Sequence, residues 1–358
     1  MSATWGNKIK FSIFGESHGV AIGGVIDGIR AGVKVDFETI DTQMKRRNHR
    51  AFYSTPRDEK DAYEILSGVR DGVTTGAPIG FMIRNKEQNS SDYVNLNNTP
   101  RPGHADYPAS VKHNGFNDYR GGGHFSGRIT APLTFAGSLA RQILEEKGVY
   151  IAAHIYSVGN AISKSILENP ITPEMAKKLQ QMEFPVLSEE VGAMMEEEIK
   201  KYQSQGDSVG GIVECAVYGM DAGIGSPFFD SVESNLAHMM FSIPAVKGIE
   251  FGKGFEISQM NGCNANDSYR MKDGKVVCRT NNNGGILGGI TNGMPIVFRV
   301  AIKPTPSVFK TQDTVNLAEG TDTDITLKGR HDACIVPRAL AVVEAASALC
   351  LLDMTESN

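Results

Sequence analysis

The sequence lacks a surplus of positive charge and a long uninterrupted apolar run. It contains 36 Lys and Arg against 41 Asp and Glu, a formal net charge of −5. Nucleic-acid-binding domains are usually basic, so this balance argues against a nucleic-acid partner. The apolar run at residues 339–354 contains Glu344 and Ser347 and is too short to span a bilayer comfortably. The N-terminal residues lack the apolar core of a signal peptide, so we expect a cytoplasmic protein that does not bind membranes.

Cysteine is scarce, and the cysteines do not form pairs in the sequence. The five residues are odd in number, widely spaced and free of any C-x-x-C pair: Cys215, Cys263, Cys278, Cys334 and Cys350. This pattern argues against a disulfide framework and against a zinc site, and it favours reduced thiols in a cytoplasm. We therefore expect no metal centre.

Glycine, in contrast, is abundant, and the cations are clustered. There are 39 glycines in 358 residues, about 11%, against roughly 7% in average usage. Five Lys or Arg residues and His49 fall within residues 44–57, and further cations lie at 101–106 and 328–338. Local clusters on an acidic chain favour a small polyanionic ligand over a long polyanion.

Hydrophobic periodicity predicts strands and helices in alternation. Strands are predicted over 9–15, 20–29, 62–69, 77–84, 151–160, 208–220 and 294–304. Helices are predicted over 133–148, 172–182, 188–206 and 229–242, with a last helix that has Pro337 in its first turn. The polar segment 311–326 is predicted to be a loop.

Short, glycine-rich connections favour an α+β fold in which mixed or antiparallel sheets are layered with helices. No linker or shift in composition divides the chain, so we expect one domain over residues 1–358. Segments 21–29, 209–219 and 287–296 have a similar glycine-hydrophobic pattern, which is weak evidence for an internal duplication.

Two short motifs offer a histidine for acid–base chemistry. GESHG at residues 15–19 follows a predicted strand, and His18 there can act as a general acid because imidazole titrates near neutrality. Adjacent side chains on a strand point to opposite faces, so a Ser17–His18 nucleophile pair is not expected. RPGHAD at 101–106 holds Arg101 and His104 in a rigid turn, where they can meet a departing phosphate. The alternatives are a histidine that caps a turn and a plain surface turn.

Two further stretches combine glycine, cations and hydroxyl groups. RGGGHFSGRITAP at 120–132 lacks the lysine of a P-loop and the spacing of a dinucleotide fingerprint. Glycines ahead of a helix can still turn backbone N–H groups toward an anion, with Arg128 as a further donor. GRHDACIVPR at 329–338 flanks Asp332 with cations, so this carboxylate is expected to be ionised and to serve as a base or a salt-bridge partner. KPTPS at 303–307 adds a lysine and two hydroxyls.

In this order and spacing, the motifs resemble the chorismate synthase family. The resemblance includes IGGVIDG after GESHG and runs from about residue 8 to residue 350. It implies a layered sandwich of sheets around helices, assembled as a homotetramer. It also implies conversion of 5-enolpyruvylshikimate 3-phosphate to chorismate and phosphate, the last step of the shikimate pathway toward aromatic amino acids. This 1,4-anti elimination requires reduced FMN but consumes no net reducing equivalents.

The resemblance also implies roles for individual residues. His18 would protonate or stabilise the reduced flavin, His104 would assist the leaving phosphate, and Asp332 would help to remove the substrate proton, possibly through the flavin N5. Positions that match FMN contacts of the family are His124, Phe125, Ser126, Pro244, Ala245, Gly288, Lys303, Pro304, Thr305, Pro306, Ser307 and Arg330. Candidates for substrate binding are Ser17, Arg46, Arg47, Arg101, Arg128 and Arg338, within or near the cationic clusters. Arg47 also matches a position associated with NADPH in members that reduce their own flavin.

Three positions depart from the family pattern. Phe52 stands where a second arginine is often found after the 46–50 cluster. Pro244 replaces a frequent asparagine, and His124 stands where many relatives have arginine. Two other functions remain open from the residues alone: a flavin-dependent oxidoreductase, and a phosphate-binding protein without catalysis.

Overall fold

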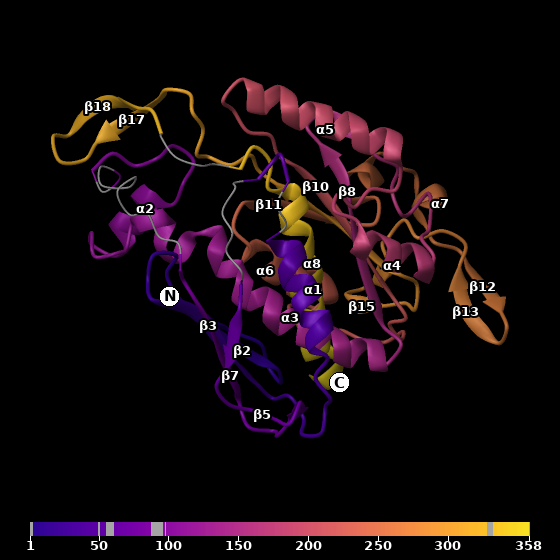
Figure 1. Ribbon diagram of the computed structural model, residues 1–358. Helices are drawn as coiled ribbons and strands as arrows, with labels where there is room; N and C mark the ends of the chain where they lie inside the picture. Colours follow the sequence, from indigo (N-terminus) through magenta and orange to yellow (C-terminus); the bar gives the residue numbers. More distant parts are fainter. Residues whose placement is uncertain are drawn as a thin grey trace.

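In the computed structural model, two five-stranded sheets enclose a layer of helices (Figure 1). The structure describes residues 3–48, 51–54, 61–86, 96, 98–327 and 332–357. The first sheet has the order β1-β2-β3-β7-β4, and every neighbouring pair is antiparallel. Its strands are β1 (Thr4–Trp5), β2 (Lys10–Gly15), β3 (Ala21–Asp27), β7 (Ile79–Arg84) and β4 (Tyr63–Ile65).

The second sheet has the order β11-β16-β10-β8-β9 and is also antiparallel throughout. Its strands are β11 (Val246–Phe251), β16 (Ile296–Ile302), β10 (Gly211–Tyr218), β8 (Tyr150–Val158) and β9 (Ala161–Ile162). The expected α+β sandwich with antiparallel sheets is therefore confirmed. Two of the similar segments, 21–29 and 209–219, contribute β3 and β10, which are interior strands of the two sheets. Internal duplication stays a prediction.

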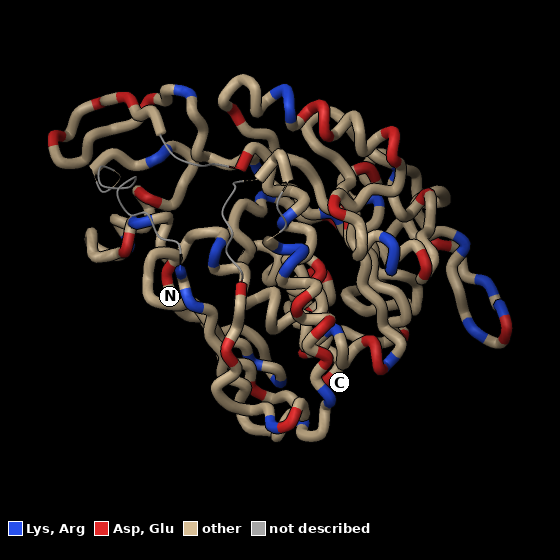
Figure 2. The backbone as a smooth tube through the Cα atoms, viewed as in Figure 1, with Lys and Arg blue, Asp and Glu red and all other residues tan. Residues whose placement is uncertain are grey.

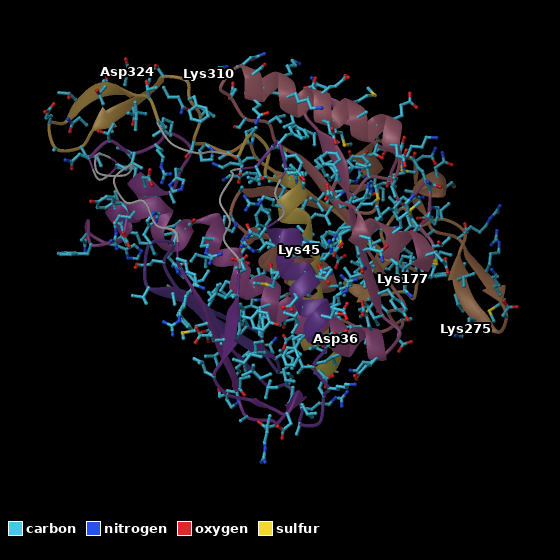
Figure 3. All side chains as sticks on the ribbon, viewed as in Figure 1. Asp36, Lys45, Lys177, Lys275, Lys310 and Asp324 are labelled. Atoms are coloured by element: carbon cyan, nitrogen blue, oxygen red, sulfur yellow. The ribbon has the colours of Figure 1, made fainter. Side chains whose placement is uncertain are left out.

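Four helices lie between the sheets: α1 (Phe37–Arg47), α3 (Thr130–Glu146), α6 (Val232–Phe241) and α8 (Val336–Ser357). Helices α3 and α8 approach closely because Gly137 has no side chain, and a Cβ there would lie 2.1 Å from the carbonyl oxygen of Ala345. Asp36 caps the start of α1 by accepting hydrogen bonds from the backbone N–H groups of Glu38 and Thr39 (Figure 3). One apolar cluster includes residues from Ile9 to Met354. Organisation as a single domain stays a prediction.

Helices α4 (Pro173–Gln181) and α5 (Glu189–Ser204) contact the second sheet near β8 and β9, outside the central helical layer. The shorter helices and strands are β5 (Val69–Arg70), β6 (Val73–Thr74), α2 (Asp106–Lys112), α7 (Gly262–Ala265), β12 (Tyr269–Lys272), β13 (Lys275–Cys278), β14 (Ile286–Leu287), β15 (Ile290–Thr291), β17 (Gln312–Asn316) and β18 (Thr321–Ile325), with 3-10 turns at Arg120–Phe125, Gly127–Ile129 and Gly254–Gln259. Figure 2 shows Lys, Arg, Asp and Glu interspersed along α5 and along the β12–β13 hairpin. No helix in the described ranges is long and apolar enough to cross a membrane.

The predicted loop at 311–326 is wrong, because these residues form the β17–β18 hairpin. The hairpin has little apolar periodicity because most of its residues remain exposed or half-buried. Hydrogen bonds, not apolar packing, join the hairpin to the segment before RPGHAD. Thr314 Oγ1 donates to the Pro100 carbonyl at 2.6 Å, and Leu317 N donates to the Asn98 carbonyl at 2.8 Å. The predicted strand over 62–69 is divided between β4 and β5, and the last helix has Pro337 in its first turn as expected.

Candidate functional site

The GESHG loop and the glycine loop, residues 120–129, lie side by side and are joined by hydrogen bonds. The backbone N–H of Ser17 donates to the Gly123 carbonyl at 3.1 Å, and the Ser17 hydroxyl is 3.0 Å from the Gly121 carbonyl. His124 Nδ1 lies 2.8 Å from the Gly15 carbonyl, so this ring donates to the end of β2. Motifs that are more than 100 residues apart in sequence therefore form one surface.

The three consecutive glycines adopt positive φ angles of 59°, 85° and 54°, which glycine tolerates best. A Cβ on Gly121 would lie 2.0 Å from Cε1 of His18, and one on Gly122 would lie 3.1 Å from Cε1 and Nε2 of His104. A Cβ on Gly123 would meet the Asp118 carbonyl oxygen at 2.1 Å. The glycines thus allow the loop backbone to approach two histidines, which were predicted separately from GESHG and RPGHAD.

His18 is buried, and its Nδ1 lies 3.3 Å from the Ser17 hydroxyl. The expectation that Ser17 and His18 point apart is wrong, because residues 17 and 18 are in a turn after β2 and no longer follow the alternation of a strand. Ser126 accepts a hydrogen bond from the Arg128 backbone N–H at 3.3 Å, and the ring of Phe125 lies 6.5 Å from that of His113, just after α2.

His104 is held by a buried ion pair at the start of α2. Its Nδ1 lies 2.6 Å from Oδ1 of Asp106, and Arg101 binds both carboxylate oxygens, Nε to Oδ2 at 2.7 Å and a terminal nitrogen to Oδ1 at 2.8 Å. Burial raises the pKa of the Asp106 carboxyl, but the hydrogen bonds from Arg101 and His104 outweigh it and hold that pKa well below its usual range. Asp106 is therefore an anion between two groups that can carry positive charge.

The RPGHAD turn contacts the KPTPS turn, and a cavity of about 300 Å³ lies between them. Lys303 donates from Nζ to the Gly103 carbonyl, and Arg101 lies 3.4 Å from the Ser307 hydroxyl. The lining includes Lys303, Pro304, Thr305 and Pro306 from the predicted cofactor set, together with Ser208 and Gln312. Thr305 Oγ1 and Gln312 Nε2 are buried and have no hydrogen-bond partner within the part of the chain that the structure describes.

The predicted cofactor residues Pro244 and Ala245 lie beside this region. Ala245 has a φ of 73°, and its carbonyl accepts a hydrogen bond from the backbone N–H of Lys303 at 3.0 Å. Gly288 lies in the turn between β14 and β15, whose next residue, Gly289, packs against Ser231 before α6. The turn that contains Gly288 therefore lies next to the start of α6.

Arg47 and Arg128 converge on the same buried carboxylate, that of Asp61, with one guanidinium at each oxygen. Burial raises the pKa of Asp61, but the two guanidinium groups outweigh it and lower that pKa below its usual range. Arg128 also donates to Asn85 Oδ1 at 3.2 Å, which ties the end of the glycine loop to the segment after β7. Two cations from the predicted substrate set are thus brought together.

Arg46 binds a carboxylate of the helical layer and does not bind Asp61. It donates to the buried Glu344 of α8 at 2.5 Å, and Arg141 of α3 binds the same carboxylate at 3.1 Å. Burial raises the pKa of Glu344, but both arginines lower it, and the net pKa is below the usual range. This guanidinium joins α1 to α8 within the helical layer, so the structure does not bring Arg46 together with Arg128.

Asp332 and Arg338 lie at the start of α8 and form an ion pair of 2.9 Å. Arg338 also donates to Asn48 Oδ1 at 2.9 Å and to the Arg47 carbonyl at 3.3 Å, so Asp332 and Arg338 lie near the end of α1. Arg330 and the remainder of the 46–50 cluster, His49 and Arg50, lie outside the described residues. Phe52 packs beside α5, with Lys200 Nζ 4.9 Å from its ring centre.

Sequence reasoning missed three side chains of this region: Asp61, Asp106 and Gln312. Asp106 had a local signal, because it stands two residues after His104. Asp61 is far in sequence from Arg128 and had none, and Gln312 lay in a segment predicted to be a loop.

Comparison with known proteins gives a consistent result. Residues 9–355 match the family model described as chorismate synthase. The chain is 45% identical over 350 residues to a chorismate synthase of Thermococcus kodakarensis, covering 97% of this chain and 96% of the relative. It is 42% identical to one of Dehalococcoides mccartyi, covering 99% and 96%. A crystal structure of a chorismate synthase superposes with a TM-score of 0.77 and 30% identity, covering 99% of this chain and 93% of that one.

Proposed function

The chain belongs to the chorismate synthase family, and from that membership we propose a division of labour among the residues of its site. The activity is that of a carbon–oxygen lyase acting on phosphates, which eliminates phosphate from 5-enolpyruvylshikimate 3-phosphate to give chorismate in the shikimate pathway. The observation that supports the proposed roles best is the position of His18 and His104 against adjacent glycines of one loop.

We infer that the cavity between the RPGHAD and KPTPS turns holds the phosphate of reduced FMN. The cavity lining offers the Lys303 ammonium and two buried donors that lack partners in the described chain, Thr305 Oγ1 and Gln312 Nε2. A cation and neutral donors at one place fit a phosphate dianion. When bound, reduced FMN would supply redox chemistry at the site without net consumption of reducing equivalents. His124, Phe125, Ser126, Ala245 and Gly288 are proposed as further flavin contacts.

In the elimination, a C–H bond and the bond between carbon and the phosphate oxygen both break. The electron pair of the C–H bond forms the additional double bond of the product, and the pair of the C–O bond leaves with the phosphate. We propose that His104 gives a proton to that oxygen, while Asp332 helps to remove the substrate proton and His18 stabilises the reduced flavin. Arg101, Arg128 and Arg338, with Ser17, offset the phosphate and the two carboxylates of the substrate. Arg47 is proposed to hold a substrate anion or NADPH, after release from Asp61. Arg46 stays the weakest candidate, because its guanidinium already binds Glu344.

An anaerobic reaction tests this function directly. The purified protein is mixed with chemically reduced FMN and 5-enolpyruvylshikimate 3-phosphate, and chorismate absorbance and free phosphate are followed. We expect many turnovers after one reductive priming, whereas an oxidoreductase would consume a reductant with each product molecule. Absence of product would refute the proposal. A second reaction with oxidised FMN and NADPH shows whether the chain reduces its own flavin.

The finer assignments on assembly and location are also proposals. We infer a cytoplasmic homotetramer from the family resemblance and from the five cysteines, none of which belongs to a C-x-x-C pair. Light scattering after size-exclusion chromatography should give four chain masses, and a monomer at micromolar concentration would contradict it.

A further inference from the structure

We propose that Asp106 is a positioning residue, which fixes the His104 ring so that proton transfer to the leaving phosphate occurs through Nε2. This inference rests on the proposed role of His104 and adds the residue through which that role is achieved. The argument depends on the contacts of three side chains, Arg101, His104 and Asp106, and on the backbone of Gly122.

The first step concerns which ring nitrogen carries the proton in neutral His104. An ionised carboxylate can only accept hydrogen bonds, and Oδ1 of Asp106 lies 2.6 Å from Nδ1 of His104. Nδ1 must therefore donate, so Nε2 is bare in the neutral ring, and the proton given to the leaving phosphate is the second proton of the imidazolium, which is held at Nε2. A terminal nitrogen of Arg101 also lies 3.0 Å from Nδ1 and could donate only to a bare Nδ1. That nitrogen already donates to Oδ1 of Asp106 at 2.8 Å, and the shorter 2.6 Å contact of Nδ1 with the same carboxylate oxygen requires a proton on Nδ1.

The second step concerns rigidity. The Asp106 side chain is 4% exposed, and the backbone N–H of Arg101 donates to its Oδ2 at 3.0 Å in addition to the two side-chain bonds. Arg101 has a side-chain exposure of 6% and is within 3.4 Å of the Ser307 hydroxyl. A carboxylate held at both oxygens cannot rotate, so the direction of its bond to His104 is fixed.

The third step concerns direction. The Cε1–Nε2 edge of His104 faces Gly122, where a Cβ would lie 3.1 Å from both atoms. Since Nδ1 is engaged by Asp106, Nε2 is the ring nitrogen available to a ligand at the glycine loop. The negative charge of Asp106 also offsets the nearby guanidinium, which would otherwise repel a protonated ring.

The test is a double-mutant cycle of kcat in the anaerobic assay, with variants Asp106→Asn, His104→Ala and both together. Asparagine keeps the volume but cannot accept through both of its terminal atoms. We expect Asp106→Asn to lower kcat by about 10²-fold, with KM changed by less than about threefold, as for other residues that orient a functional histidine. In the His104→Ala background the same change should cost less than about threefold.

Glu214→Gln is the matched control. Glu214 accepts from His154 Nε2 at 2.9 Å, and both side chains are fully buried in the second sheet, away from the glycine loop. This variant should lower the unfolding midpoint and leave kcat unchanged. The outcome that overturns the inference is an Asp106→Asn penalty of the same size in both backgrounds, which indicates a structural role. A fully active His104→Ala variant would instead contradict the proposed role of His104 itself.

A second measurement does not depend on any variant folding. The ¹⁵N chemical shifts of His104 in the unmodified protein at alkaline pH should show a protonated Nδ1 and a bare Nε2. A predominant Nε2–H tautomer would overturn the inference.

Discussion

Gly121 lies directly against His18, and a Cβ at that glycine would be 2.0 Å from Cε1 of the imidazole ring. This contact explains why residue 121 of the loop that packs against the GESHG turn is a glycine. A substitution at Gly121 can therefore test whether the distance between the glycine loop and the His18 ring matters for catalysis.

Gly121→Ala should displace His18, because the added methyl group would overlap its ring and because the φ of 59° is unfavourable for alanine. We expect kcat to fall by about 10²-fold, the scale of a displacement of about 1 Å in an active site. Gly127→Ala is the control in the same loop, since nothing lies within 4 Å of its Cβ position and its φ is not positive. Similar kcat values for the two variants would contradict this explanation.

Asp61→Asn should destabilise the protein in a pH-dependent way, because it leaves two buried guanidinium groups facing each other. The folded-state pKa of Asp61 is below the ordinary value of 3.8. Its stabilisation is therefore present above about pH 4 and is lost as the pH falls through the lower folded-state pKa. We expect a loss of about 3 kcal/mol at pH 7 that shrinks in acid.

Urea denaturation between pH 7 and pH 3 measures this difference. Glu64→Gln is the control, because it removes a carboxylate from an exposed pair with Arg84. The control should leave the urea midpoint nearly unchanged. A constant penalty for Asp61→Asn at all pH values would show that the charge of Asp61 is not the cause.

Of the five thiols, Cys263 should react rapidly with a disulfide reagent in the native protein, because it is exposed. Burial raises the pKa of Cys334 to about 12 and that of Cys350 further, so few thiolates form there. Spectroscopic titration should therefore show one fast thiol in native protein and five after denaturation. Cys263→Ser should abolish the fast phase, and its persistence would indicate that a buried cysteine is accessible.

Lys303→Met should weaken the binding of FMN by about 10- to 100-fold, the loss expected for one charge-assisted hydrogen bond. Burial lowers the pKa of Lys303, as does the neighbouring charge of Lys247, and a bound phosphate would offset both effects by stabilising the ammonium. Lys275→Met, in the β12–β13 hairpin far from the KPTPS turn, is the control (Figure 3). Fluorescence titration with FMN measures both, and equal affinities would place the phosphate elsewhere.

The structure and the sequence agree best where a segment is deeply buried. Segments such as 133–148 and 208–220 were predicted correctly because α3 is buried at every position from 130 to 144 and β10 from 213 to 217, which gives apolar runs bounded by glycine. The β17–β18 hairpin was missed because its strands are held by backbone pairing and by contacts with residues 98–100, and these leave little apolar pattern. Helix α1 was missed because its buried face includes Gln43 and Arg47 beside Ile40 and Met44, which leaves little apolar periodicity.

The sequence by itself determined which chemical groups are present and, through the order of its motifs, the family to which the chain belongs. Tertiary structure decided how these groups are paired: Asp106 with His104, Asp61 with Arg47 and Arg128, and Glu344 with Arg46. Arg46 and Glu344 are 298 positions apart in the sequence, whereas His104 and Asp106 lie within one turn. In neither case does the amino-acid sequence by itself specify the geometry of the pair. Coulomb interactions depend on distance and burial, and both are set by the tertiary structure. Arg128 therefore belongs to the candidate site, whereas Arg46 stabilises the helical layer, although both are arginines.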